Sequence, residues 1–436
     1  MSAGPAPPAP KRPGELGFRL SQRRERFCPC RFLGEAEIKN RRLWQRPILR
    51  TDEEQGLEQK VTWLELFYDL VFVVVIAEIT HTLSEDINLV SLGTFGFLFI
   101  PIWWVWIGVT FYNERFKSND VSYRLFLFLQ MIPVAAMAVF AADAMGEGST
   151  GFALAYASAR VMSIILVVRG GWHEKTFRSV STRSAIGAGI SIALFLASVF
   201  VSPPLRFTLW AIGLIVELLN PWLALKHIAT LPRVSSSRLP ERFGLFTIIV
   251  LGESIVGVIS GVARNHEATA VGITAVVGLA LAFSIWWVYF DFVASRPPKP
   301  GVWSTIFWVY LHLPMVIAIA ATGAALLAVV GSQGGPFHPE IRWLISGAVA
   351  VSLISIGLIE MLLQREPDHF THSQMSPALK FIGGTLAAGV GVLGGFFAQI
   401  PLLSVLLLLL LGQIIYGAYV GLGPFSADTS PTNSSK

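Results

Sequence analysis

The sequence predicts an all-α polytopic membrane protein, with about twelve transmembrane helices arranged as two six-helix parallel repeats. Composition, apolar runs and the placement of basic residues lead to this prediction. Of 436 residues, 53% are hydrophobic and only 14% charged, and the mean hydropathy is +0.60. Soluble domains carry about a quarter charged residues. The repeated apolar runs, each about 20 residues long, argue against a large soluble protein with buried helices.

Twelve apolar segments follow one another along the chain, and we expect each to cross the membrane once. They cover residues 61–83, 89–112, 122–142, 151–169, 184–201, 205–225, 242–261, 269–292, 303–330, 341–363, 378–396 and 398–420. The break between the last two depends on Gly394, Gly395 and Pro401.

Basic residues are strongly biased to one side of these segments. With the N-terminus in the cytoplasm, 29 of the 33 Lys and Arg residues lie on the cytoplasmic side. Arg206, Arg264 and Arg342 lie on the other side, and Arg160 lies inside a span. This asymmetry follows the positive-inside rule. An even number of spans then places both termini in the cytoplasm.

The chain is expected to divide into five parts. These are a basic, largely disordered cytoplasmic segment 1–60, a first six-helix repeat 61–230, a cytoplasmic linker 231–240, a second repeat 241–420 and a polar cytoplasmic tail 421–436. Most of the net charge of +5 comes from the first part. We expect this segment to contact anionic lipid of the bilayer rather than nucleic acid.

Three short matches indicate the repeat. The sequence IWWV occurs at 102–105 and 285–288, an offset of 183. Two span prolines, Pro133 and Pro314, are 181 residues apart, and Glu-x-Phe recurs at an offset of 176. Six spans per half give the halves the same orientation, related by a pseudo-twofold axis along the membrane normal. The competing interpretation is a shared bias for aromatic helix ends.

Ionisable groups inside apolar segments are the candidate functional residues, because charge at membrane depth usually faces a bundle interior or a water-filled cavity. Arg160 stays charged and needs a carboxylate partner or water; Glu217 and Glu253 lie at its depth. The predicted intramembrane polar site comprises Glu65, Asp69, Glu78, His81, Arg160, Glu217, Glu253 and His312. Possible pocket aromatics are Trp103, Trp104, Trp286 and Trp287.

Three interpretations of this polar set compete. The charges are structural, as in a membrane stress, sensor or assembly protein; or they form a proton- or cation-coupled path for an unknown small solute or ion; or they bind metal. Metal is disfavoured because Glu-x-x-His occurs once, at Glu78 and His81, and a di-iron bundle needs it on two helices. A membrane-embedded lipid enzyme is a weaker alternative. We expect no catalytic residues, no metal and no cofactor.

Two stretches carry a resemblance to a known family. They read WLELFYDLVFVVVIAEITH at 63–81 and ERFGLFTIIVLGESIVGV at 241–258. In these stretches, and through the double-Trp segments and the His-Leu-Pro at 312–314, the chain resembles bacterial low temperature requirement protein A over roughly 55–420. The resemblance implies a multi-pass protein of the bacterial plasma membrane, associated by name with growth in the cold. It implies no substrate, reaction or site residues.

Overall fold

The computed structural model confirms a nearly all-helical protein with many apolar helices. It describes residues 1, 4, 45–51, 61–117, 120–233, 238–264, 268–294, 296–331, 338–364 and 374–421. All described helices and strands belong to the unit Leu43–Lys436. Most of the predicted basic segment 1–60 and residues 422–436 of the predicted tail lie outside the described residues.

The helices follow the apolar segments closely. The first group is α3 (Trp63–Glu85), α4 (Leu89–Arg115), α5 (Val121–Ala141), α6 (Ser149–His173), α7 (Arg178–Ser198), α8 (Leu205–Leu223) and the short α9 (Leu225–Ile228). The second group is α10 (Arg238–Ala263), α11 (Ala268–Tyr289) with the π-helical turn η1 (Phe290–Ala294), α12 (Val302–Gly331), α13 (Pro339–Leu362), α14 (Met375–Leu393) with the 3-10 turn η2 (Gly394–Phe396), and α15 (Gln399–Gly421).

Within the described residues, eleven helices are long and apolar enough to cross a membrane. The segment expected as the sixth span forms α8, a helix of 19 residues that is not among the eleven. It is less apolar because it carries Arg206, Glu217 and Asn220. The polytopic class is therefore confirmed, and the count of twelve stays a prediction.

Local sequence explains where the first two helices begin. Thr62 caps α3: its hydroxyl accepts from the backbone N–H of Glu65, and the Glu65 carboxylate accepts in return from the N–H of Thr62. This reciprocal arrangement satisfies two donors that a helix start otherwise leaves open. Asn88 caps α4 with its side chain alone, since its Oδ1 accepts from the N–H groups of Val90 and Ser91.

A short antiparallel ribbon lies at the end of α4. Strand β1 (Ile48–Leu49) pairs with β2 (Phe116–Lys117), so that Leu49 lies opposite Phe116. The chain preceding α3 is thereby attached to the helical body by backbone hydrogen bonds.

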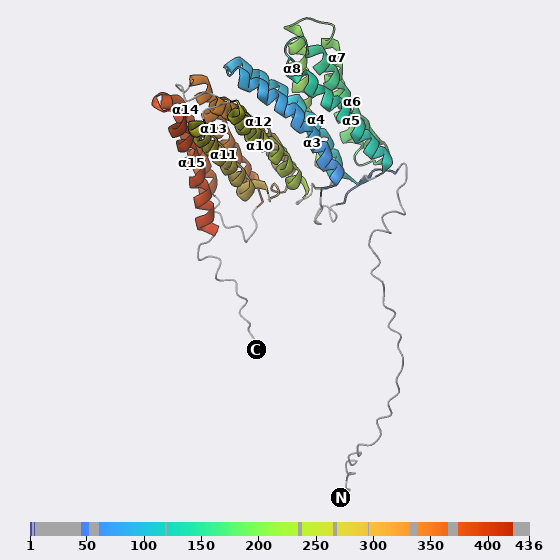
Figure 1. The fold of residues 1–436 in the computed structure, drawn as a ribbon. Helices are drawn as coiled ribbons and strands as arrows, with labels where there is room; N and C mark the ends of the chain where they lie inside the picture. The colour runs from blue at the N-terminus through green and yellow to red at the C-terminus, as the bar shows by residue number, and fades with distance from the viewer. Residues whose placement is uncertain are drawn as a thin grey trace, which may run out of the picture. The chain divides into compact units, whose positions relative to one another are not determined.

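Neighbouring helices pack in the same order in both groups. In the first, α3 packs on α5, α5 on α6, and α6 on α7; in the second, α10 packs on α12, α12 on α13, and α13 on α14. The groups meet where α3 contacts α10 and α12, and α4 contacts the same two helices (Figure 1). The most enclosed span is α12, and 78% of its apolar window is buried.

Glycines allow the closest helix crossings. A Cβ at Gly257 of α10 would lie 2.6 Å from the carbonyl oxygen of Gly323 on α12, and a Cβ at Gly261 would lie 2.7 Å from the Cβ of Val330. The same holds at Gly384 of α14, where a Cβ would lie 2.7 Å from Ile354 on α13. Small residues at such crossings let helix backbones approach in a membrane.

Candidate functional site

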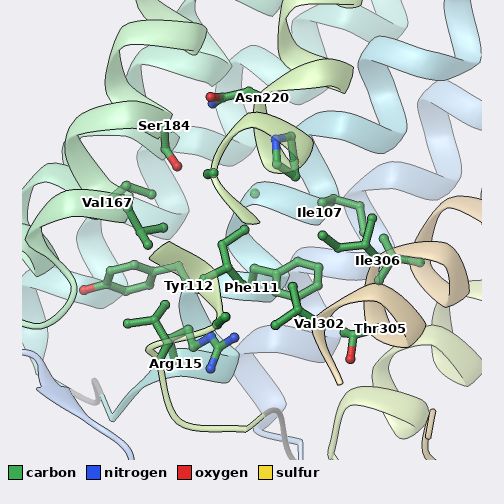
Figure 2. A pocket seen from close by; sticks show the side chains of 18 of the residues that line it. Ile107, Phe111, Tyr112, Arg115, Val167, Ser184, Asn220, Val302, Thr305 and Ile306 are labelled. Atoms are coloured by element: carbon green, nitrogen blue, oxygen red, sulfur yellow. The ribbon is translucent and has the colours of Figure 1, made fainter. Parts of the chain in front are cut away.

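A cavity of about 830 Å³ lies among α4, α6, α7, α8 and α12. In Figure 2, Val167 of α6 lies across the cavity from Ile107 and Ile306, and Asn220 lies on the side opposite to Arg115. Ligand pockets typically measure roughly 300–1,000 Å³. The cavity therefore has the size of a site for a small organic molecule.

The cavity wall is mainly apolar and its charges are mainly positive. Aromatic and aliphatic side chains from five helices form most of the lining. Among the described lining residues, the charged ones are four cations and one acid: Arg115, Arg160, Arg233, Lys299 and Glu217. Two of these cations, Arg233 and Lys299, are exposed, and both lie in the connecting segments before α10 and α12. These segments form the mouth of the cavity.

Arg160 and Glu217 form a buried ion pair in the cavity wall. Nε of Arg160 on α6 donates to Oε1 of Glu217 on α8 at 3.0 Å, and the hydroxyl of Tyr156 donates to Oε2 at 3.1 Å. The side chains are 9% and 1% exposed. A buried charge needs an opposite partner. Of the two partners expected for Arg160, Glu217 and Glu253, the structure has Glu217.

Two neighbouring features shape the surroundings of Arg160. Gly108 on α4 leaves space for the guanidinium, since a Cβ there would lie 2.9 Å from Nη1. Beside it, Gln130 of α5 donates through Nε2 to the hydroxyl of Ser163 at 2.7 Å and to the carbonyl of Ala159 at 3.2 Å. This polar contact fixes α6, and hence Arg160, against α5.

A second set of buried charges joins the two groups of helices. Glu65 and Asp69, one turn apart on α3, face Arg238 and Arg242, one turn apart on α10. Arg242 donates to Asp69 at 2.8 Å and lies 3.5 Å from Glu65, which also accepts from Arg238. We call these four residues the α3–α10 ion-pair ladder. Each charge has an opposite partner, as buried charges require.

Helix α4 completes the surroundings of the ladder. Nε1 of Trp106 donates to Oδ1 of Asp69 at 2.8 Å, and Arg242 donates to the hydroxyl of Thr110 at 3.2 Å. The guanidinium of Arg242 also lies 5.9 Å from the ring centroid of Trp106, within the range of a cation–π interaction. The ladder is thus a tightly paired site, unlike the cavity.

The remaining members of the predicted polar site lie apart from both. Glu253 of α10 is buried, 6% exposed, and its carboxylate has no ion pair or hydrogen bond to any described residue. Glu78 and His81 are exposed at the far end of α3, where His81 contacts Arg264 at 2.8 Å. His312 is fully buried and bonds the carbonyl of Trp308 at 2.7 Å.

Of the four proposed pocket aromatics, Trp104 lines the cavity. Trp103 is fully buried outside the lining. Trp286 and Trp287 of α11 are 43% and 47% exposed, and neither borders the cavity. The matching IWWV sequences therefore occupy different surroundings. Trp106, directly after the first match, donates to Asp69 of α3, whereas Trp287 of the second match donates to Asp291 of its own segment.

The structure also brings together charges that the sequence did not single out. Glu360 of α13 accepts from Lys380 of α14 at 2.9 Å and lies 3.6 Å from Arg296. Lys380 is fully buried, and its Nζ lies 3.5 Å from the ring centroid of Phe292. Like the ladder, this group depends on residues from separate helices, so that no local motif marks it.

Asp120, directly before α5, links the N-terminal ribbon to α6. Its Oδ2 accepts from the backbone N–H of Gln45 at 3.1 Å, from Arg169 at 3.0 Å and from the hydroxyl of Ser122. Burial by itself would raise the pKa of Asp120, but these donors outweigh it and hold the pKa below its ordinary value. Hydrogen bonds to a carboxylate favour its charged form.

Among the described residues, no group of three or more His, Cys, Asp or Glu side chains is arranged to hold a metal ion. The candidate site is the cavity, because it combines the space for a ligand with the buried Arg160–Glu217 pair in its wall.

The helices and the buried charges define a polytopic membrane protein, and comparison with known proteins gives its family. Residues 60–418 match the bacterial low temperature requirement A protein family (LtrA), and the chain belongs to this family. A similar protein is the uncharacterized protein RA0937 of Rhizobium meliloti (strain 1021), 29% identical over 305 residues, covering 66% of this chain and 72% of the relative. No solved structure matches the chain.

Proposed function

We propose that the chain is a secondary transporter of a small solute, with the cavity as the solute site. The cavity itself is the observation that supports this function: a space of about 830 Å³ among spanning helices, with the buried Arg160–Glu217 pair in its wall. Polar residues at membrane depth that border a cavity are typical of substrate pathways. A purely structural ion pair needs no such space.

We further propose twelve spans in two parallel six-helix halves, with α8 as the sixth span. The packing order supports this arrangement, because the first, third, fourth and fifth helices of each group contact one another in the same sequence. Pro133 lies inside α5 and Pro314 inside α12, the third helices of the two groups. Repeat transporters commonly place their sites near the contact between halves.

The proposed orientation places both termini in the cytoplasm of a bacterium and the helices in its plasma membrane. The bias of basic residues supports it, and the basic segment 1–60 would then face the anionic lipid of the inner leaflet. In this orientation the mouth of the cavity, with Arg233 and Lys299, opens to the cytoplasm.

Glu253 is the proposed coupling residue for a proton or cation. Asp69, Glu78 and Glu253 are the candidates for this role, because they lie on α3 and α10, the first helices of the two groups. Asp69 is bonded to Arg242 and Trp106, and Glu78 is exposed. Glu253 combines burial with a carboxylate that no described residue neutralises. A proton or cation can bind and leave such a group without breaking a protein ion pair.

The test is solute-driven flux in proteoliposomes that contain an internal pH dye. An amino acid, a sugar, an organic acid and an organic amine are imposed in turn as gradients. Wild type should acidify or alkalinise the interior with one of them, Glu253→Gln should abolish the signal, and the exposed Glu147→Gln should not. Flux that survives in Glu253→Gln would remove the coupling role from this residue.

A non-transporting protein is the second candidate, and the α3–α10 ion-pair ladder favours it. Its four charges are fully paired across the two groups of helices, as in a structural lock. If none of the solutes produces flux, the buried charges are better explained as structural supports of a membrane stress, sensor or assembly protein.

A further inference from the structure

We infer that the cavity binds a small organic anion with an apolar body, whose acidic group bonds the guanidinium of Arg160. The inference names the substrate class of the proposed transporter and rests on that proposal in treating the cavity as the solute site. It is argued from the donors, the charges and the apolar wall of the cavity.

The guanidinium of Arg160 has N–H groups that no described residue accepts from. Among the described residues, its only hydrogen bond runs from Nε to Glu217, so Nη1 and Nη2 have no protein acceptor there. Its side chain is nine-tenths buried and borders the cavity. Arginine presents its N–H groups as a planar fork that matches a carboxylate or phosphate. The free edge of this guanidinium is therefore a receptor for an anionic group.

Glu217 is not a comparable receptor for a cation. One carboxylate oxygen accepts from Arg160 and the other from Tyr156, and the side chain is 1% exposed. An ammonium group would have to displace one of these donors. The pair therefore exposes its positive partner to the cavity and shields its negative one.

The described charges at the mouth have the same sign. Arg233 and Lys299 are exposed there, and Arg115, which lines the same cavity, is buried. No acid other than Glu217 occurs among the described lining residues. Clefts lined by one sign of charge concentrate ligands of the opposite sign and accelerate their entry. An anion would thus be attracted at the mouth and bound at Arg160.

The wall between mouth and pair favours an apolar body. Val167, Ile107, Phe111 and Ile306 face the space between Arg115 and Asn220 (Figure 2). Burying apolar surface contributes roughly 25 cal/mol per Å². A simple inorganic anion would leave this wall without contacts, whereas an aryl or alkyl acid would cover it.

The test measures binding to the full chain in nanodiscs of phosphatidylcholine by isothermal titration calorimetry. The probes are 3-phenylpropionate, the neutral 3-phenylpropanamide and the cationic 3-phenylpropylammonium, which share one apolar body. We expect the anion to bind at least about tenfold more tightly than the other two, since charge-assisted hydrogen bonds are roughly twice as strong as neutral ones. Equal affinities, or tighter binding of the cation, would overturn the inference.

Two variants separate the contribution of Arg160 to anion binding from its contribution to folding. The double change Arg160→Gln with Glu217→Gln removes both buried charges together, so that neither is left without a partner. It should weaken the binding of 3-phenylpropionate about tenfold or more. Arg160→Lys keeps the positive charge but loses the planar fork, and it should weaken the binding of the anion less than the double change does. Arg183→Gln, an exposed cation on α7 outside the lining, is the matched control and should bind like wild type.

The mouth cations give a readout that does not depend on the buried pair. Binding of 3-phenylpropionate to wild type should weaken as salt is added, because salt screens exposed charges. Arg233→Gln with Lys299→Gln should flatten this dependence while the protein stays folded. A salt dependence identical to that of wild type would contradict the steering role of the mouth.

Flux of 3-phenylpropionate into proteoliposomes distinguishes this inference from the proposed function. Preferential binding of the anion without flux supports the anion site and overturns transport. Flux that carries the amide or the ammonium as well as the anion supports transport and overturns the anion class.

The acidic group can belong to a soluble acid or to a lipid headgroup. Adding phosphatidylglycerol to the nanodiscs distinguishes these sources. If phosphatidylglycerol weakens the binding of 3-phenylpropionate to wild type but not to the Arg160→Gln, Glu217→Gln protein, the site accepts the acidic group of the lipid. If it changes neither, the site takes the soluble acid.

Discussion

At the scale of single residues, the Arg160–Glu217 pair should be a strong determinant of stability. Arg160→Ala leaves Glu217 buried without its partner, and breaking a buried pair in this way costs about 3–5 kcal/mol. The double change Arg160→Gln with Glu217→Gln should cost clearly less. Thermal unfolding of the purified proteins in nanodiscs measures both. A double variant as unstable as Arg160→Ala would show that the unpaired charge of Glu217 is not the cause of the lost stability.

Asp120 should make the N-terminal attachment sensitive to acid. Its pKa is lowered in the folded protein, so the unfolded chain binds the proton more readily as the pH falls. The stabilisation is therefore complete above the ordinary pKa of 3.8 and is lost as the pH falls through the lower folded pKa.

Asp120→Asn should accordingly lower the unfolding temperature at neutral pH, and the gap to wild type should narrow below about pH 4. Unfolding temperatures measured from pH 7 down to pH 3 test this. Glu147→Gln, at an exposed site in the connection before α6, should show no such convergence. A gap that widens in acid would be incompatible with the lowered pKa.

The sequence predicts individual buried charges better than their partners. Arg160 was expected to meet an acid at its own depth, and Glu217 is that acid. The positive-inside rule places Arg238 and Arg242 at the cytoplasmic start of the segment 242–261, where arginines need no buried partner. Their burial becomes apparent only when α3 faces α10, which joins residues 173 positions apart.

At the scale of elements, the crossing of α10 and α12 should tolerate no added side chain. Gly257→Val would place its Cβ 2.6 Å from the carbonyl oxygen of Gly323, and backbone cannot yield as a flexible side chain does. Overpacking of this kind costs about 1–3 kcal/mol. Gly252→Val on the same helix has no heavy atom within 4 Å of its Cβ and serves as the control.

Thermal unfolding of the two variants in nanodiscs provides the measurement. Gly257→Val should unfold at a clearly lower temperature than Gly252→Val, since the two share helix, residue type and introduced side chain. Equal unfolding temperatures would mean that α10 and α12 are further apart than the structure has them.

Apolar runs predict the helices well and the cavity not at all. A run of about 20 apolar residues has few alternatives to a spanning helix, and each of the twelve predicted segments overlaps one long helix over most of its length. The segment 205–225 forms α8, which is not among the eleven helices that are apolar enough to span, because Arg206, Glu217 and Asn220 lower its hydropathy. The cavity depends on how five such helices tilt and pack, which no single segment encodes.

At the scale of the whole molecule, the cavity and the α3–α10 ion-pair ladder occupy different contacts between the same groups of helices. The cavity lies where α4, α6 and α8 approach the start of α12. The ladder lies where α3 meets α10. A transporter of two halves needs both features: a space that holds the solute and a contact that keeps the halves together while that space changes.

The ladder should therefore hold the two groups of helices together even when the chain is cut between them. Residues 1–233 and 234–436 co-expressed as separate chains should associate and co-purify through a tag on one of them. Asp69→Leu in the first chain leaves Arg242 buried without its closest acid, at a cost of about 3–5 kcal/mol. It should reduce the co-purified amount strongly, because the lost contact lies between the chains.

Two controls make this result specific to the ladder. Glu147→Gln, far from α10 along the chain and exposed, should leave co-purification unchanged. The joint change Asp69→Asn with Arg242→Gln removes both charges and should recover part of the yield. If Asp69→Leu co-purifies as well as wild type, apolar packing of α3 against α10 and α12 holds the two groups of helices together, and the ladder is not needed for it.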